Sequence, residues 1–317
     1  MNNLKQEDNC FQTTNKEYIA ETKFTFIDLF AGIGGFHIAM HNLGGECVFA
    51  SEWDLDARKT YIENFRTISP KLFAKENETE RFAGDITKVN PEDIPDHDVL
   101  CGGFPCQPFS QAGYKKGFED TRGTLFFNIA EIIKTKRPKA VFLENVRGLL
   151  NHDNGNTFEV IQNVIRELGY SFHYKIIKAS DFNLPQHRPR LYMICFRNDI
   201  KDISFDFPKP KKLTMTMSDV FDGAIVNRDI GFTLRVGGKG SAISDRRNWD
   251  GYIVNGIERR IKPKEGKRMQ GFPENFHFPV SDVVAMKQLG NSVAIPAIQN
   301  VGSEMIKVLC SNKRGDE

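Results

Sequence analysis

Short apolar runs alternate along the chain with stretches whose apolar residues recur at helical spacing. The apolar runs predict buried strands, at 24–29, 47–50, 82–86, 98–101, 140–144, 171–179 and 190–196. The periodic stretches predict helices, at 36–43, 54–65, 124–135 and 157–168. The polar stretch 69–81 predicts a loop. Strands that alternate with helices in this way indicate an α/β fold built on a doubly wound, mostly parallel sheet.

The pattern changes near Asn198. Residues 205–210 contain prolines, residues 235–244 are rich in Gly and Ser, and helical spacing is weak. These features predict a smaller, loop-rich and partly β domain. Helical spacing returns at 263–270, 282–288 and 296–309. We expect three parts: a flexible extension at 1–22, a large domain formed by 23–197 together with 280–317, and the smaller domain at 198–279.

The composition is that of a soluble globular protein, because 40% of the 317 residues are hydrophobic and 26% are charged. No apolar run approaches the ~20 residues that a membrane helix needs. The polar N-terminus lacks the apolar core of a signal peptide, so we expect a cytoplasmic protein without membrane contact. The six cysteines are scattered and form no Cys-x-x-Cys pair, which favours reduced thiols and no bound metal.

The net charge of +2 hides an uneven distribution. Residues 178–270 carry 19 Lys and Arg against 11 Asp and Glu, whereas the rest of the chain carries 24 against 30. A basic region beside a neutral-to-acidic body favours a polyanionic partner for that region. A solvated charged surface without a partner is the alternative.

The turn Phe30–Gly35 joins a predicted strand to a predicted helix, as nucleotide-binding turns do. The dinucleotide fingerprint requires a third glycine where this chain has His37. Further along, Glu52 suits ribose hydroxyls, Trp53 offers a flat face for adenine, and Asp85 suits the edge of the base. S-adenosylmethionine fits such a pocket at least as well as NAD. A tight turn and a core tryptophan are the alternative interpretations.

Cys106 lies in the segment Gly102–Ser110, directly after a predicted strand, where open α/β sheets bind their ligands. Glu144 ends another predicted strand, and the carboxyl ends of parallel strands share one edge of the sheet. A thiolate there suits addition to carbon 6 of a pyrimidine, while the acid bonds ring nitrogen 3 and the exocyclic amine. A buried inert thiol and a surface salt bridge are the alternatives.

Arg188 and Arg190 stand at alternate positions at the start of a predicted strand, so their side chains share a face. This arrangement favours one anionic site for both guanidinium groups, such as the target nucleotide, its phosphate or Glu144. Two separate surface arginines are the alternative.

Taken together, the motifs resemble those of the bacterial DNA (cytosine-5)-methyltransferases, in the family's order and from Phe26 to about Val301. The first are Phe-Ala-Gly-Ile-Gly-Gly at 30–35, Glu-Trp at 52–53, Gly-Asp-Ile at 84–86 and Gly-Phe-Pro-Cys-Gln at 103–107. Then follow Gly-Thr-Leu-Phe-Phe at 123–127, Glu-Asn-Val at 144–146 and Gln-x-Arg-x-Arg at 186–190. The last are Arg-Arg-Ile-x-Pro-x-Glu at 259–265, Gln-Gly-Phe-Pro at 270–273 and Gln-x-Gly-Asn-Ser-Val at 288–293. One such motif is a weak signal, but the ordered set is specific.

The resemblance implies a Rossmann-like methyltransferase that transfers a methyl group from S-adenosylmethionine to carbon 5 of a flipped-out cytosine, leaving S-adenosylhomocysteine and using no metal. It implies catalytic roles for four residues: Cys106 as covalent nucleophile, Glu144 on the cytosine, and Arg188 and Arg190 in support. It implies a cofactor site formed by Phe30, Gly32, Gly34, Glu52, Trp53, Asp85, Ile86, Pro105, Leu125, Asn291 and Val293. The large domain is then the catalytic and cofactor-binding domain.

The resemblance also implies a partner, double-stranded DNA carrying a short specific sequence. Residues 107–122 would form a mobile loop that closes over DNA, with contacts from Ser110, Lys115, Lys116 and Arg122. The smaller domain would be the target-recognition domain, reading base edges with Arg235, Lys239, Arg246, Arg247 and Trp249. Phosphate contacts are the alternative for each arginine. We expect a monomer that belongs to a restriction-modification system and pairs functionally with a restriction endonuclease without a stable complex.

Three other functions compete with this one. An RNA cytosine methyltransferase would carry the same catalytic motifs, although the basic Gly/Arg-rich insert favours DNA. A non-catalytic DNA-binding protein disagrees with the presence of Cys106 and Glu144. An NAD-linked oxidoreductase disagrees with His37.

Overall fold

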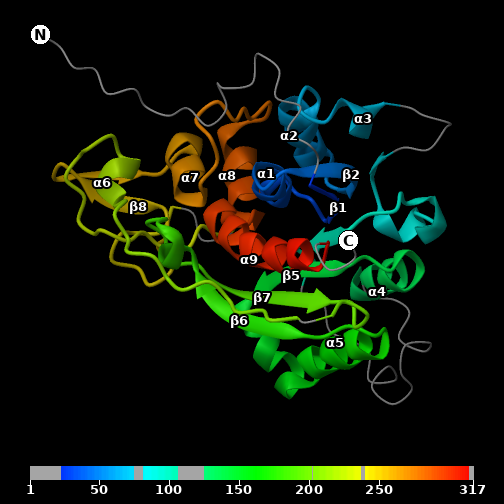
Figure 1. Cartoon of the computed structure of the whole chain (residues 1–317). Helices are drawn as coiled ribbons and strands as arrows, with labels where there is room; N and C mark the ends of the chain where they lie inside the picture. Colours follow the sequence, from blue (N-terminus) through cyan, green and yellow to red (C-terminus); the bar gives the residue numbers. More distant parts are fainter. Residues whose placement is uncertain (1–22, 75–80, 106–124, 202, 237–239, 314–317) are drawn as a thin grey trace, which may run out of the picture.

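A seven-stranded sheet forms the centre of the molecule (Figure 1). The computed structural model describes residues 23–74, 81–105, 125–201, 203–236 and 240–313. The strands are β1 (Phe24–Leu29), β2 (Gly45–Ser51), β3 (Phe82–Ala83), β4 (Val99–Gly102), β5 (Ala140–Val146), β6 (His173–Lys178) and β7 (Pro189–Phe196). Their order is β3-β2-β1-β4-β5-β7-β6. Strand β7 runs antiparallel to both β5 and β6, whereas the other pairs of this sheet are parallel.

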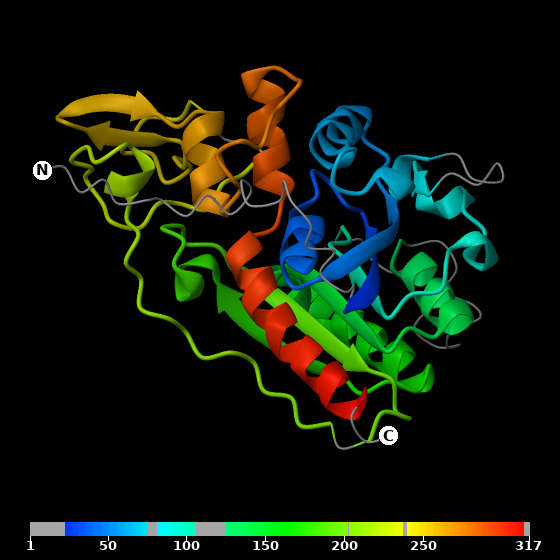
Figure 2. The ribbon, with the colours of Figure 1, turned by 45° about the horizontal axis from the view of Figure 1, so that its top comes forward.

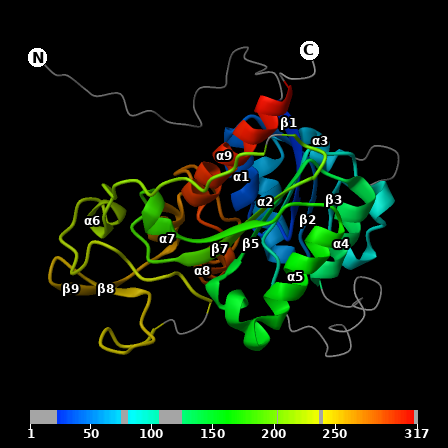
Figure 3. The ribbon, with the colours of Figure 1, turned by 60° about the horizontal axis from the view of Figure 1, so that its bottom comes forward.

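Helices cover both faces of the sheet (Figure 3). One face carries α1 (Gly35–Asn42), α2 (Leu55–Phe65) and α9 (Ile295–Lys313), and the other carries α4 (Leu125–Lys136) and α5 (Asn156–Glu167). The alternation of side chains along β4 builds both layers, since Val99 and Cys101 belong to the first core and Leu100 to the second. Within the described ranges, no helix is long and apolar enough to cross a membrane.

The predicted elements of this sheet are confirmed, with bounds that differ by a few residues. The prediction of a loop at 69–81 was wrong for residues 70–73, where the short helix α3 (Pro70–Phe73) forms one turn. Proline occupies its first position, where the missing N–H is not needed. The predicted strand at 82–86 is shorter than expected. After Ala83 the chain leaves the sheet, and Asp85 caps a 3-10 turn (Ile86–Lys88) by accepting the Thr87 N–H.

A smaller, partly β region follows β7, as the sequence predicts. An extended segment leads to it from the end of β7 (Figure 2). It contains α6 (Met217–Val220), the antiparallel hairpin of β8 (Gly251–Val254) and β9 (Ile257–Arg260), and α7 (Pro263–Gln270). Helix α8 (Asp282–Asn291) then packs on α7, and α9 returns to the sheet beside α1. The division at 198–279 stays a prediction.

Backbone groups of the smaller region take part in its attachment to the large one. The His187 N–H donates to the Gly231 carbonyl, and the Gly231 N–H donates to Pro185. The Leu234 N–H donates to Gln186 Oε1 at 3.0 Å. A methyl group added to Gly290 would lie 2.8 Å from the carbonyl of Arg235, so the backbone of this segment lies directly on the end of α8.

Gly34, which precedes α1, is required by both its backbone and its surroundings. Its φ is +85°, and an added methyl would overlap the ring of Phe65 in α2. We expect Gly34→Ala to lower the free energy of unfolding by about 2–4 kcal/mol, because left-handed strain adds to overpacking. Gly32→Ala is the matched control. Gly32 has a φ of +55° with nothing within 4 Å of the added methyl, so only the strain of about 1–2 kcal/mol applies. Urea unfolding measures both variants, and equal losses would contradict the role assigned to the Phe65 contact.

Candidate active site

A cavity of about 900 Å³ opens at the carboxyl ends of the parallel strands. Loops after β1 to β5, the start of β7 and one side of α8 form its walls. Nine of the predicted cofactor residues line it: Phe30, Gly32, Glu52, Trp53, Asp85, Ile86, Pro105, Leu125 and Asn291. Glu144, Arg188 and Arg190 line the same cavity. Most residues of the predicted cofactor site therefore share one cavity with the predicted catalytic side chains, and their roles stay a prediction.

Glu52 connects the end of β2 to the glycine-rich turn after β1. Its Oε2 accepts the Gly32 N–H at 2.8 Å, and its Oε1 accepts the Asp54 N–H at 2.8 Å. Burial raises the pKa of the Glu52 carboxyl, and these backbone hydrogen bonds offset part of the shift. Each oxygen keeps a second lone pair, so the carboxylate is able to accept further hydrogen bonds from a bound ligand. Trp53 stands next to it with 79% of its surface exposed.

Two predicted cofactor residues lie outside the cavity lining. A methyl on Gly35, the first residue of α1, would lie 2.6 Å from Val293 Cγ2, so Val293 packs against the start of that helix. Gly34 faces Phe65 and not the cavity. Asp85 does line it, but Oδ1 already accepts the backbone N–H and hydroxyl of Thr87. Both hydrogen bonds lower the pKa of Asp85, and the one from the Thr87 hydroxyl has the larger effect.

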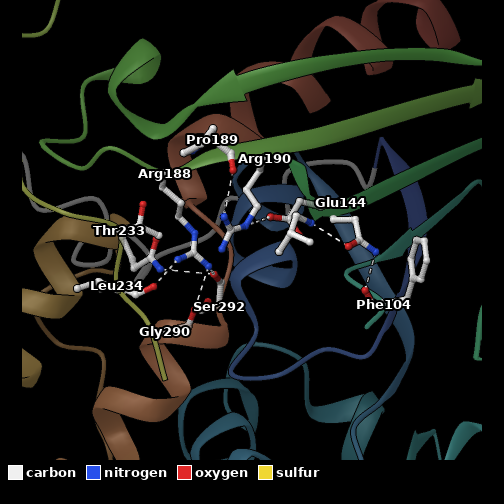
Figure 4. A network of polar contacts seen from close by, with 12 residues as sticks. Phe104, Glu144, Arg188, Pro189, Arg190, Thr233, Leu234, Gly290 and Ser292 are labelled. Atoms are coloured by element: carbon white, nitrogen blue, oxygen red, sulfur yellow. Dashed lines mark hydrogen bonds and ion pairs between the residues drawn. The ribbon is translucent and has the colours of Figure 1, made fainter. Parts of the chain in front are cut away.

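The buried Glu144 and the partly buried Arg190 form an ion pair on the opposite wall (Figure 4). Arg190 Nε lies 3.1 Å from Glu144 Oε1. The antiparallel register brings them together, because Val146 pairs with Arg190 and Glu144 with Tyr192. Burial raises the pKa of Glu144, and the positive charges of Arg190 and Arg188 offset part of the shift. A carboxyl group is therefore held in one place, and burial raises its pKa above the ordinary value.

The segment that leads to the predicted nucleophile lies against Glu144. A methyl on Gly103 would lie 3.9 Å from Glu144 Oε2. The side-chain amide of Asn145 donates to the Phe104 carbonyl at 2.9 Å. Pro105 lines the cavity, and Cys106 follows it directly in the sequence. Cys106 itself and the predicted DNA contacts Ser110, Lys115, Lys116 and Arg122 lie outside the described residues.

Arg188 differs from its expected role as a second partner of the same anion. Its guanidinium is buried and donates to three backbone carbonyls, those of Leu234, Gly290 and Ser292. Figure 4 shows it turned toward these carbonyls, while Arg190 turns toward Glu144. Burial lowers the pKa of Arg188 to about 9, so the group stays charged at neutral pH. Its contacts tie the start of β7 to the end of α8 and to the smaller region.

The predicted base-reading residues have different surroundings. Arg235 and Arg246 are exposed, whereas Arg247 is exposed but paired with Asp245 at 2.7 Å. Lys239 lies outside the described residues. The assignment of Trp249 to base reading was wrong, because its side chain is 1% exposed and belongs to the hydrophobic core. A large aromatic side chain between charged and polar neighbours was mistaken for a surface residue.

Sequence reasoning missed the contacts that join α2 to α8 at the cavity. Lys287 Nζ lies 3.6 Å from Asp54 Oδ2, and the Thr60 hydroxyl lies 3.0 Å from Gln288 Oε1. Lys287, Gln288 and Asp54 line the cavity. The available signal was the position of Lys287 and Gln288 beside the Gly-Asn-Ser-Val motif. In the described part of the chain, no group of three or more His, Cys, Asp or Glu side chains is arranged to hold a metal ion.

Known proteins share this fold. The chain resembles a solved Dnmt2 methyltransferase from S. pombe with a TM-score of 0.66 and 19% identity, covering 90% of this chain and 99% of that one. It resembles the Entamoeba histolytica methyltransferase EhMeth with a TM-score of 0.64 and 18% identity, covering 90% and 98%. With the strand order and the antiparallel β7, these matches define a Rossmann-like methyltransferase fold.

Sequence comparison defines the family. The model of the C-5 cytosine-specific DNA methylases matches residues 24–236 and 230–307. The chain is 42% identical to the type II methyltransferase M.HhaI of Haemophilus parahaemolyticus, over 90% of this chain and 96% of that protein. It is 42% identical to M.HpaII of Haemophilus parainfluenzae, over 90% of each. The chain therefore belongs to the C-5 cytosine-specific DNA methylase family and is a DNA (cytosine-5)-methyltransferase. This membership decides against an NAD-linked oxidoreductase.

Asp28 in β1, below the glycine-rich turn, is a buried acid that the sequence reading did not single out. Neither of its oxygens has a hydrogen-bond partner among the described residues. Burial raises the pKa of Asp28 well above the ordinary value of 3.8, and the nearby His37 backbone offsets only part of this. The folded state therefore holds the proton more tightly than the unfolded state does.

The wild type should lose stability as pH rises above about 4, until the pH passes the folded-state pKa of Asp28. We expect Asp28→Asn to remove this loss, so that the stability of the variant relative to wild type increases with pH. Urea unfolding between about pH 5 and about pH 8 measures the difference. Asp93→Asn, at an exposed aspartate, controls for the substitution itself. A relative stability that is constant with pH would show that Asp28 does not bind a proton at neutral pH.

Proposed function

We propose that this enzyme transfers the methyl group of S-adenosylmethionine to carbon 5 of a cytosine flipped out of a short specific sequence in double-stranded DNA. One observation carries the proposal. Glu52 and Trp53 share a single cavity with the Glu144–Arg190 pair. This arrangement supports a donor site next to a site for a pyrimidine, as direct transfer between two bound molecules requires.

The cavity residues fit S-adenosylmethionine. Glu52 would accept ribose hydroxyls, Trp53 would stack on adenine, and Asn291 would reach the methionine end. The remaining wall would come from Phe30, Gly32, Asp85, Ile86, Pro105 and Leu125, with Gly34 and Val293 supporting it from behind. When bound, S-adenosylmethionine supplies an electrophilic methyl group and leaves as S-adenosylhomocysteine. We propose that the reaction uses no metal.

The residues of this chain activate the cytosine. The Cys106 thiolate forms a bond to carbon 6, and the displaced ring electrons make carbon 5 nucleophilic. Glu144 holds a proton at ring nitrogen 3 and bonds the exocyclic amine, while Arg190 holds Glu144 in place. After methylation, loss of the proton on carbon 5 expels the thiolate and restores the ring. Arg188 supports this site indirectly, through the backbone carbonyls that it holds.

The DNA contacts are proposed from chemistry and position. A base inside a duplex cannot present carbon 6 to a thiol, so the cytosine must be flipped out. Residues 107–122 would close over it, with Ser110, Lys115, Lys116 and Arg122 on the DNA. Arg235, Lys239, Arg246 and Arg247 of the target-recognition domain would contact bases and phosphates. Arg247 would first have to exchange its partner Asp245.

The relatives named type II methyltransferases support a modification enzyme of a restriction-modification system. We infer a cytoplasmic monomer that pairs with a restriction endonuclease through their shared DNA sequence and without a stable complex. The proposed catalytic and cofactor-binding domain comprises 23–197 and 280–317, and the target-recognition domain comprises 198–279.

The substrate is tested by methyl transfer from labelled S-adenosylmethionine to duplex DNA and to transfer RNA, side by side. We expect incorporation into DNA, and sequencing of the methylated cytosines should identify one short motif. DNA with 5-fluorocytosine in that motif should trap a covalent complex, because fluorine replaces the carbon 5 proton whose loss expels the thiolate. Transfer to RNA and none to DNA would overturn the proposal.

The two catalytic assignments are tested by Cys106→Ser and Glu144→Gln. Cys106→Ser should form no trapped complex and transfer no measurable methyl, because a serine hydroxyl is a far weaker nucleophile than a thiolate. Glu144→Gln should lower kcat roughly 10²- to 10⁴-fold, because the amide does not provide the proton to ring nitrogen 3. Binding of the unmodified DNA motif serves as the folding control. A trapped complex formed by Cys106→Ser would place the nucleophile elsewhere.

A further inference from the structure

The strand that carries one wall of the proposed adenosine site is very short. Strand β3 consists of Phe82 and Ala83, and it pairs with β2 through Ala50 and Ser51 alone. A final backbone hydrogen bond, from the Glu52 N–H to the Ala83 carbonyl at 3.1 Å, closes the ladder. So short an edge strand has little stability of its own. Immediately after it, Gly84, Asp85 and Ile86 line the cavity.

The side chain of Arg58 in α2 adds hydrogen bonds to backbone carbonyls where this ladder ends. Its Nη1 donates to the Glu52 carbonyl at 3.1 Å and also to the Ala83 carbonyl. Its Nη2 donates to the Phe82 carbonyl at 3.0 Å. The guanidinium carbon lies 4.4 Å from the centroid of the Phe82 ring, in a cation–π contact. One side chain therefore holds the ends of both β2 and β3.

These contacts fix two walls of the cavity relative to each other. Glu52 directly follows β2, with its carboxylate on the glycine-rich turn, and Asp85 follows β3. Arg58 itself does not line the cavity. Hydrogen bonds from a charged donor are stronger than neutral ones, and the planar guanidinium reaches several acceptors at once. A lysine at this position would reach fewer of these carbonyls in one geometry.

We propose that Arg58 is a positioning residue for S-adenosylmethionine, acting through the backbone of Glu52, Phe82 and Ala83. The inference rests on the proposed function, because it takes this side of the cavity as the adenosine site. Without Arg58, the β3 end and Asp85 lose their fixed distance from Glu52. The cofactor must then order this wall when it binds, which weakens its affinity.

The test compares Arg58→Ala with Arg58→Lys. We expect Arg58→Ala to raise the Kd and the KM for S-adenosylmethionine roughly tenfold to a hundredfold, since several charge-assisted hydrogen bonds are lost. The KM for DNA, and kcat at saturating cofactor, should change by less than about threefold, because Glu144 and Arg190 lie on the opposite wall. Arg58→Lys should recover part of the affinity. Arg66→Ala, at an exposed arginine that caps the same helix, should behave as wild type.

The readouts separate this role from simple stabilisation. A variant that only folds less well lowers the active fraction and hence kcat, while the KM for the cofactor stays constant. Thermal unfolding identifies the temperature at which each variant is fully folded, and titration calorimetry is done there. A cofactor Kd within about twofold of wild type for Arg58→Ala would overturn the inference. If the wild type neither binds S-adenosylmethionine nor methylates DNA, the proposed function fails instead.

Discussion

The direction of one strand decides where the catalytic groups meet. Strand β7 runs against its neighbours, so its first residues lie at the edge where β5 ends. Had β7 been parallel, Arg190 would lie at the far end of the sheet from Glu144. Antiparallel pairing instead sets Arg190 opposite Val146. Arg190 Nε then lies 3.1 Å from Glu144 Oε1. The ion pair, the position of Arg188 and the attachment of the smaller region all follow from this reversal.

Burial of acids is the second constraint on the site. Glu52 and Glu144 both lie in low-dielectric surroundings that raise the pKa of their carboxyl groups, yet their partners differ. Glu52 accepts two backbone N–H groups, which orient it within the turn. Glu144 has an arginine beside it, which holds the carboxyl group while burial raises its pKa. The surroundings of Glu52 suit binding of hydroxyl groups, and those of Glu144 suit proton donation.

The alternation of strands and helices and the chemistry at strand ends were predictable, because periodicity and motif order are properties of the sequence. Glu52 and Glu144 were found in this way. Arg58 was not, because its partners are main-chain carbonyls, which no side-chain pattern marks. The burial of Trp249 and the carbonyl contacts of Arg188 were missed for a related reason. Both side chains are polar or aromatic groups in a basic region, and tertiary packing buries them.

The attachment of the smaller region has a consequence for how freely its surface residues can vary. Gly231 and Leu234 are held through their N–H and carbonyl groups, by partners that belong to the large domain. Every residue type except proline offers the same backbone groups. Amino-acid replacements at exposed positions of the attached segment therefore leave these joints intact, whereas a methyl group on Gly231 would lie 2.7 Å from Met217 Sδ. Substitutions on the exposed surface of the smaller region are thus able to change that surface while the Glu144–Arg190 pair keeps its geometry.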